Sequence, residues 1–206
     1  AITTVFVNDG LQEIAEYEAV FVPATPTRTF VFGSYIDEPL LMVAAGVKTY
    51  YHANNLFSVA ALSNQAGSVV ERYTYDPYGK VKILAADGVT VRTSSVVGNP
   101  WTFTGRRLDT ETGLFFFRNR MWDSALGRFA NRDPLGYFDG LNFYCGYFVP
   151  NAVDPEGFGR NYDRYLRECG DGGDGVTTCI PISIKMSPKG TAPTVKNGWG
   201  LKKPAG

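Results

Sequence analysis

Histidine is almost missing from this 206-residue chain, in which His52 is the only one. This excludes Ser-His-Asp and Cys-His nucleophilic sites within the chain, together with metal sites built from several histidines. His52 follows Tyr51 on an expected strand, and we interpret it as a structural residue.

An excess of charge and a long apolar run are missing too. Twenty basic and twenty acidic residues balance, so the body has no broad field to attract nucleic acid or an anionic membrane. The longest apolar stretch, "EPLLMVAAGV" (38–47), is interrupted by Gly46 and is far shorter than the ~20 residues of a membrane span. The first residues, "AITTVFVNDG", lack the features of a signal peptide. We therefore expect no membrane span, and a start that lies inside a longer protein or follows processing.

Cysteine is scarce, and the three present (Cys145, Cys169, Cys179) cannot all pair. Cys169 and Cys179 flank "GDGGDGVTT" and could close a small loop or remain thiols. Asp171 and Asp174 in this loop lack the full spacing and the bidentate Glu of a calcium loop. We expect neither a metal nor a cofactor.

Aromatic residues and glycine are abundant, with 12 Tyr, 14 Phe and 23 Gly. Tyr and Phe favour strands and Gly favours turns, so the composition predicts a mainly β protein. We interpret the Tyr and Phe side chains as sheet-packing residues rather than platforms for sugars. Strands are expected within 3–7, 28–36, 48–52, 57–62 and 69–75, separated by turn residues. Residues 11–20 fit either a helix or a strand with acidic edges, and 160–169 fit one short helix.

The tetrapeptide pattern Asp-Pro-x-Gly occurs three times, at 76–79, 133–136 and 154–157. Pro and Gly suit a tight turn, and the leading Asp can accept hydrogen bonds from the main chain that follows. An Asp in this position is ordinarily a structural cap, and we assign that role to Asp76. The later two copies bracket another acid, Asp139, which raises the question of whether some of these carboxylates do chemistry.

The composition changes after residue 158. Residues 159–206 are rich in Gly, Pro, Lys and Thr and poor in large apolar side chains. Such a stretch buries too little surface to offset the entropy of ordering it. We predict a boundary at 158/159 and an irregular tail beyond it.

Two stretches resemble a known family. The segment 50–81, ending in "VERYTYDPYGKV", is similar to the tyrosine-aspartate (YD) repeat of Rhs proteins. The segment 99–158, from "NPWTFTGRRLD" to "NAVDPEGF", closely resembles the Rhs repeat-associated core domain. The resemblance covers about residues 28–158.

The resemblance implies a curled antiparallel YD-repeat sheet, part of a hollow Rhs shell, that ends in a core domain plugging the shell. The expected ranges are 1–84 for the last repeat strands, 85–158 for the core domain and 159–206 for a variable tail. Core domains of this kind act in toxin-complex C proteins and bacterial polymorphic toxins as aspartyl autoproteases. They release a C-terminal segment, which is both substrate and cargo. The resemblance also implies a secreted or cell-surface protein, with a toxin-complex or secretion-system partner and an immunity protein.

Matched by position, the family's catalytic Arg falls on Arg120, and its catalytic acids fall on Asp133 and Asp154. Asp139 matches a supporting acid. The implied cut lies between Phe158 and Gly159, at the change in composition. Arg128 and Arg132 are interpreted as structural or solvated.

The chain departs from the family pattern in three places. The linker between Asp139 and Asp154 is about two residues short and lacks Asn-Asn-Pro. Phe158 replaces the commoner Leu before the cut. The tail is only 48 residues long.

Two carboxyls held close cannot both ionise, so one could accept a proton from water while the other donates one. A nearby guanidinium could hold one acid ionised or bind the oxyanion. These acids favour an autoproteolytic core. The alternative is a non-catalytic cell-surface adhesion or wall-associated protein whose core domain only caps a shell.

Overall fold

The computed structural model describes residues 3–18, 25–137, 140–146, 148–150 and 152–158. The tail with Cys169, Cys179, Asp171 and Asp174, and the helix predicted at 160–169, lie outside the described residues. Within the described residues, all the strands belong to two antiparallel sheets.

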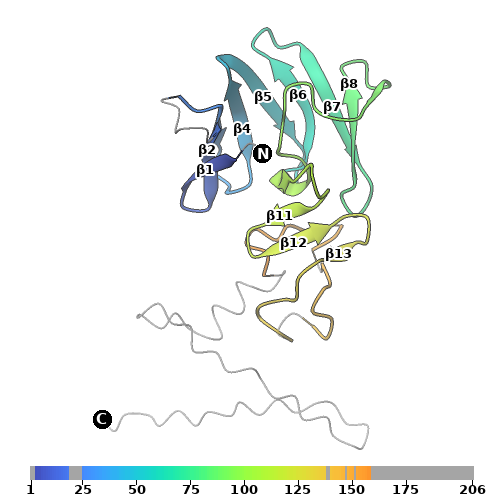
Figure 1. Cartoon of the computed structure of the whole chain (residues 1–206). Coiled ribbons are helices and arrows are strands. Elements are labelled where there is room, and N and C mark those ends of the chain that lie inside the picture. Colours follow the sequence, from blue (N-terminus) through green and yellow to red (C-terminus); the bar gives the residue numbers. More distant parts are fainter. Residues whose placement is uncertain (1–2, 19–24, 138–139, 147, 151, 159–206) are drawn as a thin grey trace, which may run out of the picture.

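Nine strands form the larger sheet, and each pairs antiparallel with the next strand in the sequence. The strands are β1 (Thr4–Asp9), β2 (Gln12–Glu18), β3 (Arg28–Phe32), β4 (Pro39–Ala44), β5 (Val47–Ala53), β6 (Val59–Asn64), β7 (Val69–Tyr75), β8 (Val81–Ala85) and β9 (Val91–Arg92). The sheet curves but does not close, because β1 and β9 remain its two edges (Figure 1). This confirms the predicted fold class, a mainly β, open, curled antiparallel sheet.

Strand β2 settles the ambiguity of residues 11–20 in favour of a strand. Acidic and apolar residues mix along it, and the adjacent residues Ala15 and Glu16 are both buried. Strand β7, expected within 69–75, shows a period of two more clearly, since Glu71 and Tyr73 are buried while Arg72 and Thr74 are exposed. Period-two alternation is the pattern of a strand with one face covered.

No strand is expected in the apolar run 38–47, but β4 lies within it. A continuous apolar run does not show the period of a strand, which explains the omission. Ala45 and Gly46 link β4 to β5 with φ values of 48° and 78°. Positive φ at both central residues is the geometry of a type I′ hairpin turn.

The concave core of the larger sheet is closed by a residue from outside it. Its buried members come from β3 to β7 and from one loop residue; they are Phe30, Met42, Tyr51, Val59, Leu62, Tyr73 and Trp101. The indole of Trp101 meets the rings of Phe30 and Phe32 edge-on at centroid distances of 5.5 and 5.4 Å. The loop after β9 therefore fills the hollow of the sheet.

Four short strands form the second sheet: β10 (Arg107–Leu108), β11 (Phe115–Phe117), β12 (Arg120–Asp123) and β13 (Arg128–Phe129). It lies below one end of the larger sheet (Figure 1) and has its own aromatic core of Phe103, Phe115, Phe117, Trp122, Phe129 and Phe148. The expectation that 28–158 is mostly β holds up to Phe129. After Phe129, the described residues form turns and bridges rather than strands, because Asp-Pro, Asn and Gly break the alternation.

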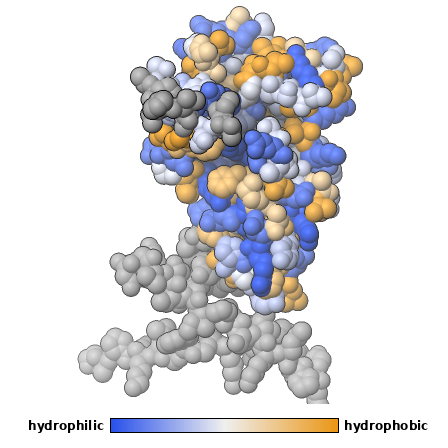
Figure 2. All heavy atoms as spheres, viewed as in Figure 1, coloured by the Kyte–Doolittle hydropathy of each residue, from blue (hydrophilic) through white to orange (hydrophobic). Residues whose placement is uncertain are grey.

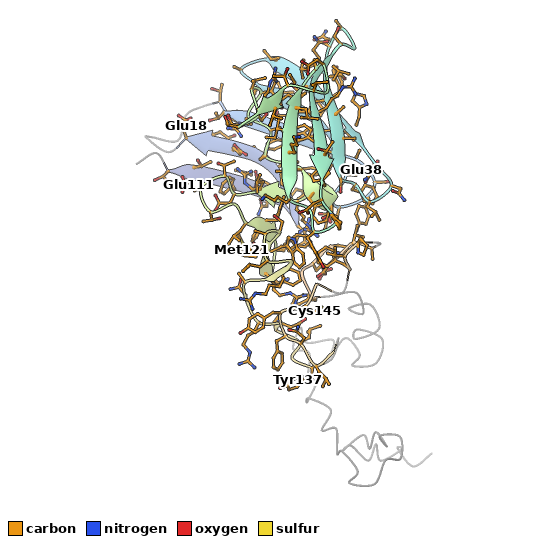
Figure 3. The ribbon with its side chains drawn as sticks, turned by 90° about the vertical axis from the view of Figure 1, so that its right-hand side faces the viewer. Glu18, Glu38, Glu111, Met121, Tyr137 and Cys145 are labelled. Carbon is orange, nitrogen blue, oxygen red and sulfur yellow. The ribbon has the colours of Figure 1, made fainter. Side chains whose placement is uncertain are left out.

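Figure 3 shows the smaller sheet with Met121 on it, and the turns with Cys145 and Tyr137 below the sheet. Figure 2 shows hydrophilic and hydrophobic residues interspersed over the visible face.

None of the described residues belongs to a helix long and apolar enough to cross a membrane. The boundary between residues 84 and 85 stays a prediction.

The first Asp-Pro-x-Gly turn joins the two sheets. The Tyr78 carbonyl accepts a hydrogen bond of 2.9 Å from the Trp122 indole. Gly79 has a φ of 90°, and a Cβ there would lie 2.3 Å from the Phe103 ring. The turn at 76–79 therefore docks the larger sheet on the second core, which goes beyond the predicted corner of a repeat.

Candidate functional site

One buried guanidinium connects the two predicted catalytic aspartates. Arg120 begins β12 and is 2% exposed. Its Nη1 forms an ion pair with Asp133 Oδ2 at 2.9 Å, and its Nη2 forms one with Asp154 Oδ2 at 3.3 Å. The guanidinium also stacks over the Phe129 ring, 3.6 Å from its centroid. The structure thus brings Arg120, Asp133 and Asp154 together in a site shielded from water.

The three Asp-Pro-x-Gly turns use one carboxyl oxygen in the same way. Oδ1 of Asp76 accepts from the Tyr78 and Lys80 amides at 2.9 and 2.8 Å. Oδ1 of Asp133 accepts from the Leu135 amide at 2.8 Å. Oδ1 of Asp154 accepts from the amides of residues 157 and 158 at 3.0 and 3.1 Å.

The second carboxyl oxygen distinguishes the turns. Asp76 itself is exposed, whereas the Asp133 and Asp154 side chains are 6% and 1% exposed, and their Oδ2 atoms face Arg120. The capping hydrogen bonds are a local property of the tetrapeptide, whereas the ion pairs with the Arg120 guanidinium depend on the tertiary structure. Arg120 supplies the positive charge that two neighbouring buried carboxylates need.

The peptide unit just before the predicted cut is held on both sides. Its carbonyl, from Gly157, accepts from Arg120 Nε at 2.5 Å, and its amide, from Phe158, donates to Asp154 Oδ1. Gly157 has a φ of 73°. A Cβ at Gly157 would lie 2.0 Å from the Phe117 carbonyl oxygen, so the turn depends on glycine.

The remaining predicted residues divide into two groups. Asp139 and Gly159 lie outside the described residues. Arg128 and Arg132 are exposed and place their guanidinium groups over the rings of Tyr144 and Phe143. Both contacts fit the predicted structural role.

Sequence reasoning missed four further site residues. Three of them, Arg106, Arg118 and Asn119, contact the turn at 154–157, and the fourth is Asp37. Asp37 reaches the turn only through Arg106 and Arg118, with ion-pair distances of 2.9 and 2.8 Å. Burial raises the pKa of Asp37, although both guanidiniums oppose the shift. Burial lowers the pKa of Arg106 to about 10, so it stays charged at neutral pH. Arg118 and Asn119 sit in the matched "FRNRMWD" stretch, but no sequence signal links Asp37 to it.

A pocket of about 320 Å³ borders this network on the side of β1 and β2. Aromatic side chains line part of it, among them Phe6, Phe32 and Trp101. Asp37, Arg106 and Arg118 line another part. The network therefore forms a wall between the pocket and the turn at 154–157.

Arg120→Ala is expected to destabilise the protein strongly. Removing one partner of a buried ion pair costs about 3–5 kcal/mol, and here two carboxylates lose the same guanidinium. Arg132→Ala is the matched control because Arg132 is exposed, and its cost should be within about 0.5 kcal/mol. Urea unfolding followed by circular dichroism measures both; equal midpoints would contradict the expectation.

Among the described residues, no group of three or more His, Cys, Asp or Glu side chains could hold a metal ion. The expectation of no metal or cofactor stays a prediction.

No family model matches the chain. It is 31% identical over 116 residues to the double-stranded DNA deaminase toxin A of Burkholderia cenocepacia, covering 55% of this chain and 8% of that protein. It is 30% identical over 138 residues to the tRNA3(Ser)-specific nuclease WapA of Bacillus spizizenii, covering 64% and 6%. It is 27% identical over 131 residues to salivary gland surface protein 1 of Aedes aegypti, covering 60% and 4%. The chain thus spans less than a tenth of each of these relatives, two of which are a toxin and a nuclease.

Solved structures show the same fold. The crystal structure of TcdB2-TccC3-TEV matches with a TM-score of 0.55 and 18% identity over 76% of this chain and 8% of that chain. A Photorhabdus luminescens Tc holotoxin pore matches with a TM-score of 0.52 and 18% identity over 76% and 7%. At this identity the likeness concerns the fold, which the chain shares with components of a toxin complex.

Proposed function

We propose that this chain is part of a bacterial Rhs (YD-repeat) shell protein of the polymorphic-toxin type, which cuts itself between Phe158 and Gly159. In this proposal 1–84 are the last repeat strands, 85–158 the core domain and 159–206 the released segment. The toxin relatives and the shared fold support the setting. The protein would be secreted or at the cell surface, with a toxin-complex or secretion-system partner and an immunity protein.

One observation carries the catalytic part of the proposal. A single buried guanidinium contacts Asp133, Asp154 and the Gly157 carbonyl, one residue before the cut. Ionisable groups gathered in a water-shielded site are typical of active sites. A structural ion pair alone would not require the carbonyl beside the cut to be part of the cluster.

The contacts suggest different roles for the two acids. Asp154 accepts from the amides of Gly157 and Phe158, directly before the cut, so we assign its carboxylate to orienting the turn. Asp133 is then the proton carrier. It accepts a proton from water as the oxygen bonds to the Phe158 carbonyl carbon, and gives it to the Gly159 nitrogen as the C–N bond breaks. The products are a carboxyl group at Phe158 and an amine at Gly159.

Arg120 would stabilise the negative charge that develops on the Phe158 carbonyl oxygen through the field of its guanidinium. This differs from two carboxyls sharing one proton, because the guanidinium pairs with both acids. The substrate is tethered and cut once, so high effective concentration replaces turnover. Asp139 keeps its predicted supporting role.

The test is to purify the complete gene product and follow its intact mass, with N-terminal sequencing of any fragment released. We expect a new N-terminus at Gly159 and a first-order rate that does not change with protein concentration, because the reaction is intramolecular. A chain that stays intact, or a rate that rises with concentration, would contradict the proposal.

The surface-protein alternative has one supporting observation, the similarity to salivary gland surface protein 1. It predicts an intact chain in the same experiment. Its core domain would cap the shell and use the buried ion pairs only for stability.

A further inference from the structure

Four consecutive main-chain carbonyls just before the predicted cut each accept a hydrogen bond from a side chain. The donor and acceptor pairs are Arg106 Nη2 to Asp154 (2.6 Å), Arg118 Nη1 to Pro155, Asn119 Nδ2 to Glu156 (2.7 Å) and Arg120 Nε to Gly157 (2.5 Å). We name these four donors the carbonyl clamp. It binds main-chain atoms, so it fixes the path of the turn without selecting the side chains at 155 and 156.

The hairpin β11–β12 explains why three adjacent residues reach three adjacent carbonyls. Phe117 pairs with Arg120, which leaves Arg118 and Asn119 as a two-residue turn. Arg118 has a φ of 58°, which is uncommon for a residue other than glycine. The close approach of Gly157 to the Phe117 carbonyl brings the two turns into contact. Strained backbone of this kind is concentrated at functional sites.

Two members of the clamp depend on a residue from the other sheet. Asp37 lies between β3 and β4, is 2% exposed, and pairs through Oδ2 with Arg106 and through Oδ1 with Arg118. Its main chain is also close-packed, since a Cβ at Gly105 would lie 1.9 Å from the Asp37 carbonyl oxygen. Asp37 can hold both guanidiniums only when the β3–β4 hairpin is formed and packed on the second sheet.

We propose that Asp37 is a positioning residue for the cleavage reaction, and that it makes cutting conditional on the larger sheet having folded against the smaller one. It acts through Arg106 and Arg118, which hold the Asp154 and Pro155 carbonyls and thereby place the bond at 158/159. This inference rests on the proposed self-cleavage. Its consequence is that a chain whose β3–β4 hairpin has not packed on the smaller sheet releases its C-terminal segment more slowly.

The experiment measures the cleavage half-time of Asp37→Asn in the complete gene product by intact mass. An amide keeps the size of the side chain but removes the charge that holds two guanidiniums, and displacements of about 1 Å at a reacting bond slow reactions up to about 100-fold. We expect cleavage to slow by about tenfold to 100-fold, and Asp37→Glu, which restores the carboxylate, to recover part of the rate. Asp87→Asn is the control, since Asp87 likewise lies between two strands of the larger sheet but is exposed and caps only its own turn; it should be cut normally.

A double variant separates positioning from loss of stability. If Asp37 acts through Arg118, Asp37→Asn combined with Arg118→Gln should be no slower than the slower single variant. Additive slowing, or normal cutting in Asp37→Asn, overturns the proposal. If Asp37→Asn does not accumulate as folded protein, normal cutting in Arg118→Gln overturns it equally. An uncut wild-type protein would instead contradict the proposed self-cleavage itself.

Discussion

Asp133→Asn is expected to leave the complete protein uncut. The amide oxygen can still accept the Leu135 amide hydrogen, so the turn at 133–136 should keep its shape. An amide cannot take a proton from water and return it to the leaving nitrogen, and loss of a general acid–base group slows reactions by about 10²- to 10⁴-fold. Intact mass measured over hours after purification, with circular dichroism to verify folding, tests this.

Asp76→Asn is the matched control for this variant. It makes the same chemical change in the same tetrapeptide pattern, where an exposed carboxyl caps the turn. Its cost should be about 1 kcal/mol of stability or less, with cleavage unchanged. Equal cleavage rates in the Asp133 and Asp76 variants would show that Asp133 takes no part in the reaction.

Gly157→Ala is expected to have a comparable effect on cleavage without touching an ionisable group. The added Cβ would lie 2.0 Å from the Phe117 carbonyl oxygen. The turn must therefore move away from β11, which breaks the bond between Arg120 Nε and the Gly157 carbonyl. A shift of about 1 Å beside a reacting bond can cost about 100-fold in rate. The cleavage half-time by intact mass measures this.

Gly136→Ala is the control that separates the effect of the steric clash at Gly157 from the effect of a positive φ. Gly136 has a φ of 68°, close to the 73° of Gly157, but a Cβ there would meet nothing within 4 Å. It should therefore bear only the left-handed backbone cost of about 1–2 kcal/mol and be cut at a nearly normal rate. If both alanine variants are cut equally fast, close packing of Gly157 against β11 is not needed for the reaction.

Much of the fold followed from local patterns. Alternation in 69–75 places Glu71 and Tyr73 on one face of a strand and Arg72 and Thr74 on the other, and the fold class follows from several short strands separated by turn residues. The pattern failed where it carried no period, as in β4, and left two options where acids and apolar residues mix, as in β2. In β2, Arg107 and Arg28 pair with the buried Glu16, so partners from elsewhere in the chain decided that a charged residue could face inward.

The site divides in the same way. The main-chain caps of Asp76, Asp133 and Asp154 involve residues two to four positions away, so the sequence alone determined them. The sequence alone also determined the β-rich composition and the change in composition at 158/159. Tertiary structure alone decided which carboxyl oxygens face a guanidinium. Arg120 lies 34 residues from Asp154, and Asp37 lies 81 residues from Arg118. Ion pairs between residues so far apart in the sequence depend on how distant segments pack, because the partners meet only when both are buried together.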